Sequence, residues 1–285
     1  MGWSILSLTL IACGQEDTLS QSQIPFSVVS VILGNTRIPQ LDTTGAGAFV
    51  NDDINTLFFQ NGNGELEQTF NYQYGKTYYW YELELPQSVE GLKVSACYPP
   101  VDTENPKYYQ WDVTNSQLPT SDFLAAQATV LQQNAASQVN LKFKHLMHLF
   151  KVKLEADETS VIPSTLDTAI LTLSQWKPTA ILNLFTAEVQ KVTGAPSQQS
   201  QTGHQGLFIL PPQETGDIQL KVQIGHRTST FNLSDIRIEN KPISQLESGK
   251  TLTLTIKVSK ETFCITGQDI SGWENQGEAN GEIIL

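Results

Sequence analysis

Short apolar stretches alternate with polar residues along the whole chain from Ile24 onward, and Gly, Pro, Asn or Asp separates them. This period-two pattern predicts half-buried β-strands. The clearest case is the segment 250–257, where Leu252, Leu254 and Ile256 would face the core and the intervening threonines the opposite side. The expected strands are residues 26–33, 46–50, 56–60, 67–72, 77–85, 92–98, 108–113, 123–130, 139–154, 169–174, 180–189, 206–210, 217–224, 227–233, 251–258 and 263–270.

The long stretch 139–154 changes register in its middle. Its apolar residues have odd numbers before Lys144 and even numbers after Leu149. Because successive side chains of a strand point to opposite faces, this switch predicts a bulge or bend between Lys144 and Leu149. Helical periodicity is weak throughout, and residues 120–130 are the best candidate for a helix.

A chain of 285 residues suits two domains of about 130 residues each. The Gln-rich segment 132–138 is expected to link them, and residues 194–203 are expected to be a flexible loop. The expected organisation is a leader and tether over 1–23, an N-terminal domain over 24–136 and a C-terminal domain over 137–285. Both domains are expected to be β-sandwiches with Greek-key connections, so the predicted fold class is all-β.

The charge of the chain excludes one class of function, and its cysteines bear on how the strands pack. The formal net charge of −12 and the lack of a Lys/Arg cluster argue against nucleic-acid binding. The densest basic stretch, residues 142–153, alternates with apolar residues as the solvent-facing side of a strand would. Cys97 and Cys264 lie in apolar strand-like runs, which favours two buried thiols, with a bridge between them as the alternative.

The first thirteen residues hold the sharpest local motif. A short apolar run ends in Leu10-Ile11-Ala12-Cys13, which resembles the lipobox of bacterial lipoprotein signal peptides. In that class the peptidase cuts before the Cys, and its sulfur then carries a diacylglycerol. No Lys or Arg precedes the run, and the alternative is a buried strand with an unrelated Cys13. The acidic segment 14–17 resembles the surface-export signal of some Gram-negative lipoproteins.

Further segments, in this order, resemble the fimbrillin family, the subunits of the type V pili of Gram-negative gut and oral bacteria. After the lipobox come an apolar strand that ends in Asn35-Thr36-Arg37 and an aromatic strand, Gly75-Lys76-Thr77-Tyr78-Tyr79-Trp80. Residues 94–99, 122–126, 139–146 and the tail 251–273 follow. The order of these segments across nearly the whole chain carries the resemblance.

The resemblance implies two transthyretin-like β-sandwich domains in tandem and a location at the outer membrane, on the cell surface and in the fimbrium. It also implies an assembly mechanism. A trypsin-like surface protease would remove the N-terminal segment after an Arg, and a strand of a neighbouring subunit would fill the vacated groove. The implied partners are other pilus subunits in a homo- or hetero-polymer, this protease, and outer-membrane lipid through acylated Cys13. A host or bacterial surface ligand is a further candidate.

Arg37 is the only Lys or Arg among the first 75 residues, and Gly34, Asn35 and Pro39 around it predict an accessible turn. A protease specific for basic residues would therefore cut between Arg37 and Ile38 and release the strand within residues 24–37. The alternative is an ordinary loop Arg. The residues expected to take part in strand exchange are Phe26, Val28, Val29, Val31, Ile32 and Leu33 in the removable strand and Ile283, Ile284 and Leu285 in the C-terminal donor candidate.

Other candidate sites have simpler interpretations. The four histidines lack the spacing of a metal site, so His145 and His148 are expected to be structural, with no metal and no cofactor. Asn51-Asp52-Asp53 is expected to be a solvated turn rather than a Ca²⁺ loop. The aromatic segments 78–81 and 108–111 are candidates for stacking on sugars, but half of each would be core. Thr43 and Thr168 follow Asp in triplets that resemble the O-glycosylation acceptor of these bacteria.

No nucleophile elbow, phosphate loop or dinucleotide fingerprint occurs in the sequence, so no enzyme activity is expected. The leading hypothesis is a structural pilin that polymerises by strand exchange after processing on the cell surface and supports adhesion. The alternative is a surface lipoprotein that binds glycans for nutrient capture and does not polymerise.

Overall fold

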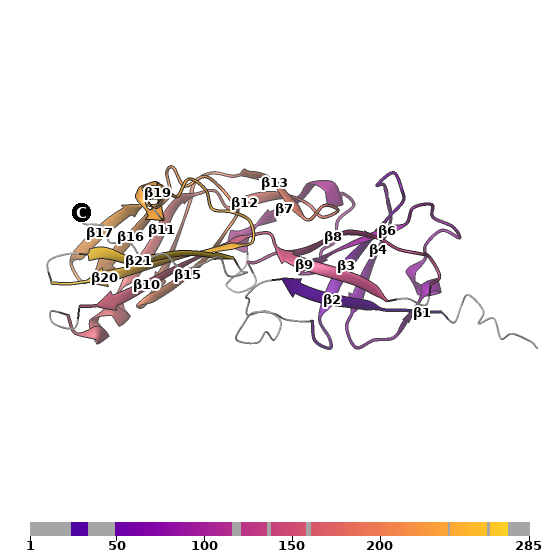
Figure 1. Cartoon of the computed structure of the whole chain (residues 1–285), viewed down its shortest axis with the longest axis horizontal. Coiled ribbons are helices and arrows are strands. Elements are labelled where there is room, and N and C mark those ends of the chain that lie inside the picture. Colours follow the sequence, from indigo (N-terminus) through magenta and orange to yellow (C-terminus); the bar gives the residue numbers. More distant parts are fainter. Residues whose placement is uncertain are drawn as a thin grey trace, which may run out of the picture.

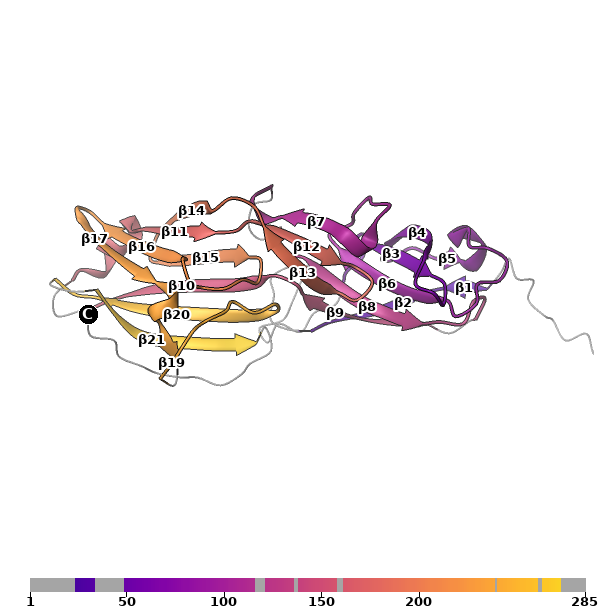
Figure 2. The same cartoon turned by 90° about the horizontal axis from the view of Figure 1, so that it is seen from above.

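Strands make up most of the regular structure, as the alternating pattern predicts (Figure 1). The computed structural model describes residues 24–33, 49–115, 121–135, 138–157, 161–238, 240–260 and 263–272. The strands form two groups that lie end to end along the longest axis (Figures 1 and 2). The predicted all-β fold class is confirmed.

A six-stranded sheet forms the first group, which we call the first lobe. In spatial order its strands are β2 (Val28–Leu33), β9 (Val139–His145), β8 (Leu124–Val130), β6 (Lys93–Tyr98), β3 (Ile54–Gln60) and β4 (Leu66–Gln73). Neighbouring strands are antiparallel except β2 and β9, which are parallel. The short strand β1 (Pro25–Phe26) pairs with β5 (Tyr78–Tyr79), and the 3-10 helix η2 (Trp80–Leu83) follows β5.

Two four-stranded sheets form the second lobe. One has the order β15 (Gln205–Leu210), β10 (His148–Ala156), β20 (Lys250–Val258) and β21 (Phe263–Gly272). The other has the order β14 (Ser197–Thr202), β11 (Ile170–Trp176), β16 (Gln219–Ile224) and β17 (Arg227–Asn232). Only β10 and β20 are parallel among these pairs. Phe150, Leu171, Leu220 and Leu254 from the two sheets are fully buried in one core.

A three-stranded sheet joins the lobes, in the order β13 (Glu188–Thr193), β12 (Thr179–Asn183) and β7 (Tyr109–Asp112). β7 comes between two first-lobe strands in the sequence, whereas the β12–β13 hairpin follows a second-lobe strand. Phe185 of this hairpin contacts Phe58 of β3, with ring centroids 6.4 Å apart, and its carbonyl accepts a hydrogen bond from the N–H of Ala128 at 2.9 Å. The second-lobe core therefore continues into the first lobe, where it includes Phe58, Cys97 and Ala125.

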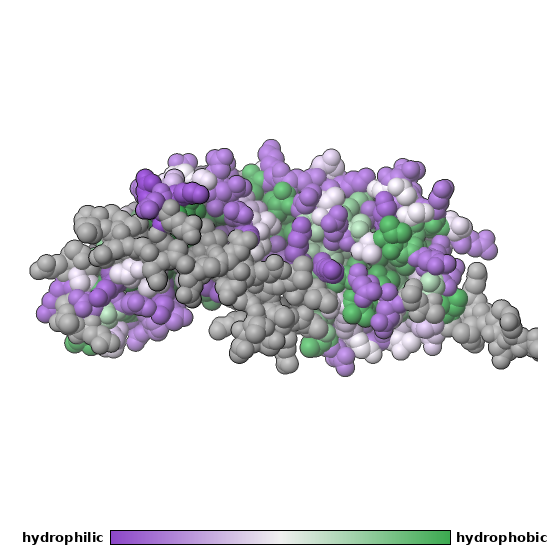
Figure 3. All heavy atoms as spheres, in the orientation of Figure 1, coloured by the Kyte–Doolittle hydropathy of each residue, from purple (hydrophilic) through white to green (hydrophobic). Residues whose placement is uncertain are grey.

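The opposite side of the six-stranded sheet packs into a separate core, which includes Leu57, Phe59 and Phe143. The remaining elements are short: η3 (Pro106–Tyr108), η4 (Val113–Asn115), η5 (Pro163–Thr168), η6 (Leu233–Asp235), β18 (Arg237–Ile238) and β19 (Lys241–Pro242). Within the described ranges, no helix has the length and apolar character needed to span a membrane. On the face shown in Figure 3, hydrophobic residues gather over the first lobe and the junction, and the described surface of the second lobe is mostly hydrophilic.

The boundary expected between residues 136 and 137 needs correction because it falls within one sheet. β8 lies before it and β9 after it, and the two strands pair in the first lobe. The Gln133 side chain, in the supposed linker, donates to the carbonyl of Pro86 at 2.7 Å and accepts from the N–H of Val89 at 2.9 Å. The chain instead passes from one lobe to the other at Leu146 and Met147.

The predicted break between Lys144 and Leu149 is confirmed at this passage, where β9 ends and β10 begins. Buried side chains have odd numbers in β9, and in β10 the fully buried apolar ones have even numbers. Residues 124–130 form strand β8, so the strand predicted over 123–130 is confirmed and the helix considered for 120–130 is not formed. The expectation of a flexible loop over 194–203 was wrong, because this segment contains strand β14. Pairing of β14 with β11 outweighs its local composition.

Candidate functional site

The strand β2 lies at the edge of the first-lobe sheet and pairs with one strand, β9 (Figure 1). The parallel register aligns Val28 with Val139 and Ser30 with Leu141. Just before β2, the carbonyl of Ser27 accepts a hydrogen bond from the N–H of Val139 at 2.9 Å. The other backbone edge of β2 pairs with no strand among the described residues. We call the place that β1 and β2 occupy the edge slot.

Phe26 is the main apolar anchor of the edge slot, and only 2% of it is exposed. Its ring centroid lies 5.2 Å from that of Trp80, 5.9 Å from Phe59 and 6.1 Å from Tyr72. The contacts with Trp80 and Tyr72 are edge-to-face, an arrangement that aromatic quadrupoles favour. Burying a Phe side chain contributes about 1.5–3 kcal/mol. A strand that occupies this slot therefore needs a large apolar side chain at this position.

The next residues follow the inward–outward alternation of a strand. Val28 and Ser30 are buried, whereas Val29 between them is 37% exposed. The N–H of Val28 donates to the hydroxyl of Tyr72 at 3.3 Å, and the hydroxyl of Ser30 is hydrogen-bonded to that of Tyr74. β2 is thus held by apolar burial, a parallel ladder on one side and tyrosine hydroxyls.

Tyr74 is the polar end of the edge slot. Its hydroxyl also accepts a hydrogen bond from the side-chain amide of Asn55 at 3.1 Å. Burial raises the pKa of Tyr74 to about 12, so the phenol stays protonated at neutral pH. If β2 left, this hydroxyl would exchange its Ser30 partner for water.

The structure brings Phe26 and Val28, two of the predicted strand-exchange residues, into the edge slot and leaves Val29 partly exposed. Val31, Ile32 and Leu33 continue β2 in register with β9. The other predicted positions lie outside the described residues: Cys13, Arg37, Ile38, Thr43, Ile283, Ile284 and Leu285. Thr168 is exposed at the end of η5, and its hydroxyl donates to the carbonyl of Thr165 at 3.0 Å.

The sequence did not predict the walls of the edge slot. Tyr72 and Tyr74 come from β4 and the turn after it, and Asn55 comes from β3. The available signal was the spacing of Phe70, Tyr72 and Tyr74, because aromatic residues at every second position point to one face of a strand.

The two histidines at the passage between the lobes have structural contacts. His145 Nδ1 lies 2.6 Å from a carboxylate oxygen of Asp122, and His148 Nδ1 lies 2.9 Å from the carbonyl of Glu247. Burial lowers the pKa of His148 to about 4, so its ring is neutral at physiological pH. Across the described part of the chain, no three His, Cys, Asp or Glu side chains are grouped to hold a metal ion.

The remaining predicted positions have ordinary surroundings. Cys97 is a buried free thiol, and burial raises its pKa above the usual range for cysteine. The side chain of Cys264 lies outside the described residues. Asp53 accepts a hydrogen bond from the N–H of Val50 at 2.8 Å within a turn. Tyr81 and Tyr108 are 60% and 65% exposed, and the Tyr81 ring stacks on a neighbouring tyrosine.

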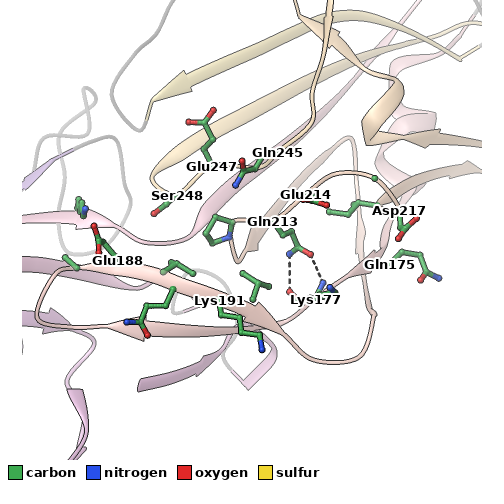
Figure 4. A pocket seen from close by; sticks show the side chains of 18 residues that line it. Gln175, Lys177, Glu188, Lys191, Gln213, Glu214, Asp217, Gln245, Glu247 and Ser248 are labelled. Carbon is green, nitrogen blue, oxygen red and sulfur yellow. Dashed lines mark hydrogen bonds between the residues drawn. The ribbon is translucent and has the colours of Figure 1, made fainter. Parts of the chain in front are cut away.

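A polar groove of about 970 Å³ lies along β13 (Figure 4). Glu188 and Lys191 of β13 form one wall, and Glu247 lies on the opposite side. The Gln213 amide bonds the backbone of Lys177 at 2.8 and 3.1 Å, which fixes the end of the groove. No aromatic side chain is among the described residues that line it. The groove offers amides and charges of both signs, without a surface for stacking.

Comparison with known proteins places the chain in a family. Residues 40–273 match the sequence profile of the fimbrillin-like family. Among curated proteins, none matches the chain. The fold is similar to that of a proposed cell adhesion protein of Bacteroides uniformis, with a TM-score of 0.67 and 17% identity over 87% of this chain and 99% of that one.

Two further structures share the fold. A proposed cell adhesion protein of Bacteroides ovatus has a TM-score of 0.61 and 17% identity, over 89% of this chain and 99% of that one. A proposed cell adhesion protein of Parabacteroides distasonis has a TM-score of 0.51 and 9% identity, over 91% of this chain and all of the other. These identities show a common fold, while the profile match spans most of the sequence. The chain therefore belongs to the fimbrillin-like family.

Proposed function

We propose that this protein is a structural pilus subunit that polymerises by strand exchange at the edge slot. The observation that carries the proposal is the single pairing of β2 with β9 at the sheet edge. Loss of β1 and β2 would expose the pocket of Phe26 and one backbone edge of β9. An extended segment of a neighbouring subunit would then restore both, because strand addition supplies main-chain hydrogen bonds and fills alternate pockets.

The proposed route to the surface follows from the leader. The chain is exported as a lipoprotein through acylated Cys13 to the outer membrane, and a trypsin-like protease then cuts between Arg37 and Ile38. The cut separates the lipid and β2 from the rest of the chain. The C-terminal residues Ile283, Ile284 and Leu285 are the donor candidate, because they offer apolar side chains for the vacated pockets. No step requires an enzymatic activity of this chain.

The direct test compares the full chain with a chain that begins at Ile38. We expect the truncated chain to form polymers whose length rises with protein concentration in electron micrographs, while the full chain forms no linear polymers. A synthetic peptide of residues 24–33 should occupy the slot and stop growth, and the same peptide with Phe26→Ala should act much more weakly. Removing residues 273–285 from the truncated chain should also stop growth. A folded truncated chain that stays monomeric would contradict strand exchange.

The mature protein on cells tests the processing step. Its N-terminal sequence and mass should show a chain that begins at Ile38 and carries no lipid. A chain that still begins at acylated Cys13 would be inconsistent with a polymerising subunit and would favour an anchor or the alternative function.

The alternative function is glycan binding by a surface lipoprotein that does not polymerise. The exposed rings of Tyr81 and Tyr108 and the polar groove of Figure 4 support it. Sugar-dependent changes in tryptophan fluorescence, together with a retained lipid, would favour this alternative. Unchanged fluorescence across a panel of neutral and acidic glycans would count against it.

A further inference from the structure

One side of the sheet β14-β11-β16-β17 packs into the second-lobe core, and the other side carries short polar side chains. We call this outer side the polar face, and its four strands lie side by side in Figure 2. The strand register aligns Ser200, Thr172, Lys221 and Thr230 in one row. The rows on either side consist of Ser, Thr, Gln and Asn, with Ile170 as their apolar member.

Hydrogen bonds between strands order part of the polar face. The hydroxyls of Thr172 and Ser200 lie 2.9 Å apart, and the Gln219 amide donates to the Asn232 side chain at 3.2 Å. Side chains that are already held lose less conformational entropy when a partner binds. The face is therefore better prepared for a contact than isolated flexible residues would be.

The charge of the polar face differs from that of the whole chain. The chain has 29 acidic residues and a net charge of −12, yet none of the four strands contains Asp or Glu. Lys221 supplies the one charge of the face, and Asp235 at its rim accepts a hydrogen bond from the side chain of Asn232 at 2.8 Å. By contrast, the outer side of β10 carries an ion pair between Lys153 and Glu155 at 2.7 Å.

We propose that the polar face is a lateral contact between two copies of this chain. Two copies with a net charge of −12 repel each other, and the polar face is a place where no carboxylate would oppose another. Ser, Thr, Asn and Gln side chains both donate and accept hydrogen bonds. The same surface can therefore satisfy itself across a two-fold axis, as an isologous contact requires.

The size of the polar face makes this contact weak. Four strands about 4.8 Å apart, with about six residues each at 3.4 Å per residue, cover roughly 400 Å² per copy. Two such faces bury about 800 Å², which is below the 1,200 Å² of a stable complex. We therefore expect a dissociation constant on the order of 1 mM for a single pair.

Repetition would strengthen the contact. In a polymer, each subunit presents the same face, so many weak contacts act together along two parallel polymers. This consequence rests on the proposed pilin function, whereas the pairwise contact does not. Side-by-side association of two polymers is the form that the contact would take in a pilus.

The test uses the full chain with Cys13→Ser, so that no lipid contributes and no polymer is needed. Sedimentation and small-angle X-ray scattering at rising concentration should show reversible self-association at physiological salt. Lys221→Glu should weaken it by about tenfold or more, because it replaces the one cation that each face offers to an acidic partner with a carboxylate. Lys142→Glu is the matched control, since it changes net charge equally at an exposed position of β9, and it should leave most of the association intact.

The outcomes separate this proposal from strand exchange. Equal loss in both variants would reduce the effect to net charge and overturn the proposal, as would a wild-type chain that stays monomeric up to several millimolar. Binding of a neutral polysaccharide by the polar face without self-association would also overturn it. The chain that begins at Ile38 gives a combined test. Bundled polymers from this chain, and single polymers from the same chain with Lys221→Glu, would support both proposals. Failure to polymerise at all would affect only the strand-exchange proposal.

Discussion

One strand in each lobe, β2 in the first and β10 in the second, has a parallel neighbour, but the two strands differ in their surroundings. β2 runs parallel to β9 in the first lobe, and β10 runs parallel to β20 in the second. Among the described strands β2 has this single neighbour, whereas β10 also pairs with β15 on its other side. The parallel pair is therefore common to both strands, and the second neighbour of β10 is what distinguishes it from β2. A second neighbour commits both backbone edges of a strand to hydrogen bonds, which is why strand exchange is proposed at β2 and not at β10.

The side chains of the two strands show the same contrast. Phe150, Val152 and Leu154 of β10 are all buried in a core shared by both sheets of the second lobe and by the junction. Phe26 and Val28 fill a slot at the side of a core that the rest of the first lobe builds. Removal of β10 would open the centre of the molecule, while removal of β2 would open an edge.

The largest expected effect comes from truncating the buried phenylalanine of each strand. Phe150→Ala should lower the free energy of unfolding by about 3–5 kcal/mol, because it leaves a cavity in the shared core. Phe26→Ala should also lose buried aromatic contacts. Much of its effect should be a lower free energy of local opening of β2, rather than of global unfolding. Urea unfolding measures the first effect, and hydrogen exchange of the β2 and β9 amides measures the second. Unchanged exchange in Phe26→Ala would show that β2 is no easier to open than β10.

The next largest effect is a loss of stability at low pH, because β10 begins with a buried neutral histidine. The unfolded chain takes up a proton on His148 near pH 6.5, whereas burial lowers the pKa in the folded protein to about 4. The unfolded state therefore binds more protons between these values, and stability falls as pH drops from about 6.5 to 4, by about 3 kcal/mol in total.

His148→Gln should remove this part of the pH dependence, measured as the urea midpoint from pH 7 to pH 4. His204→Gln is the control, since that imidazole is exposed and pairs with Asp167 at the surface. An identical pH profile in the wild type and His148→Gln would contradict the role of burial.

A smaller effect is expected at Gly249, which lies close to the backbone just before β10. Gly249 has a φ of +68°, and an added Cβ would lie 3.1 Å from the carbonyl oxygen of His145. Gly249→Ala should cost about 2 kcal/mol, from the left-handed backbone and the close contact together. Gly225→Ala has a similar φ of +58° but meets no atom within 4 Å, so it should cost only about 1 kcal/mol. If the two variants lowered the melting temperature equally, the close contact between the added Cβ and the His145 carbonyl oxygen would contribute nothing to the loss.

The smallest effect is expected at the outward position of β2. Val29→Ala should change stability by less than about 0.5 kcal/mol, because Val29 is 37% exposed. It is also the matched control for Phe26→Ala, and it should leave the hydrogen exchange of β9 unchanged. A loss as large as that of Phe26→Ala would mean that β2 is covered on its outer side as well.

Local pattern predicted much of the fold but little of the candidate site. Alternation found most strands, and the change from odd to even apolar positions located the passage between the lobes near Leu146. Two Gln-rich segments, 132–138 and 194–203, do not form the linker and the loop that their composition predicted, because composition does not determine which strands a segment will join. For the site, the sequence indicated Phe26 and Val28, whereas Tyr72, Tyr74 and Asn55 emerged only from the structure.

The sequence by itself determined that this is an all-β protein with a strand at its start, because the two-residue period of a strand is a local property of the backbone. Tertiary structure alone decided that this strand lies at an edge, with one neighbour in the part of the chain that the structure describes, and that the hairpin containing Phe185 crosses to the other lobe. Both depend on pairing between segments far apart in the sequence. The register of such pairs is set by the burial of both partners together, which no single segment encodes.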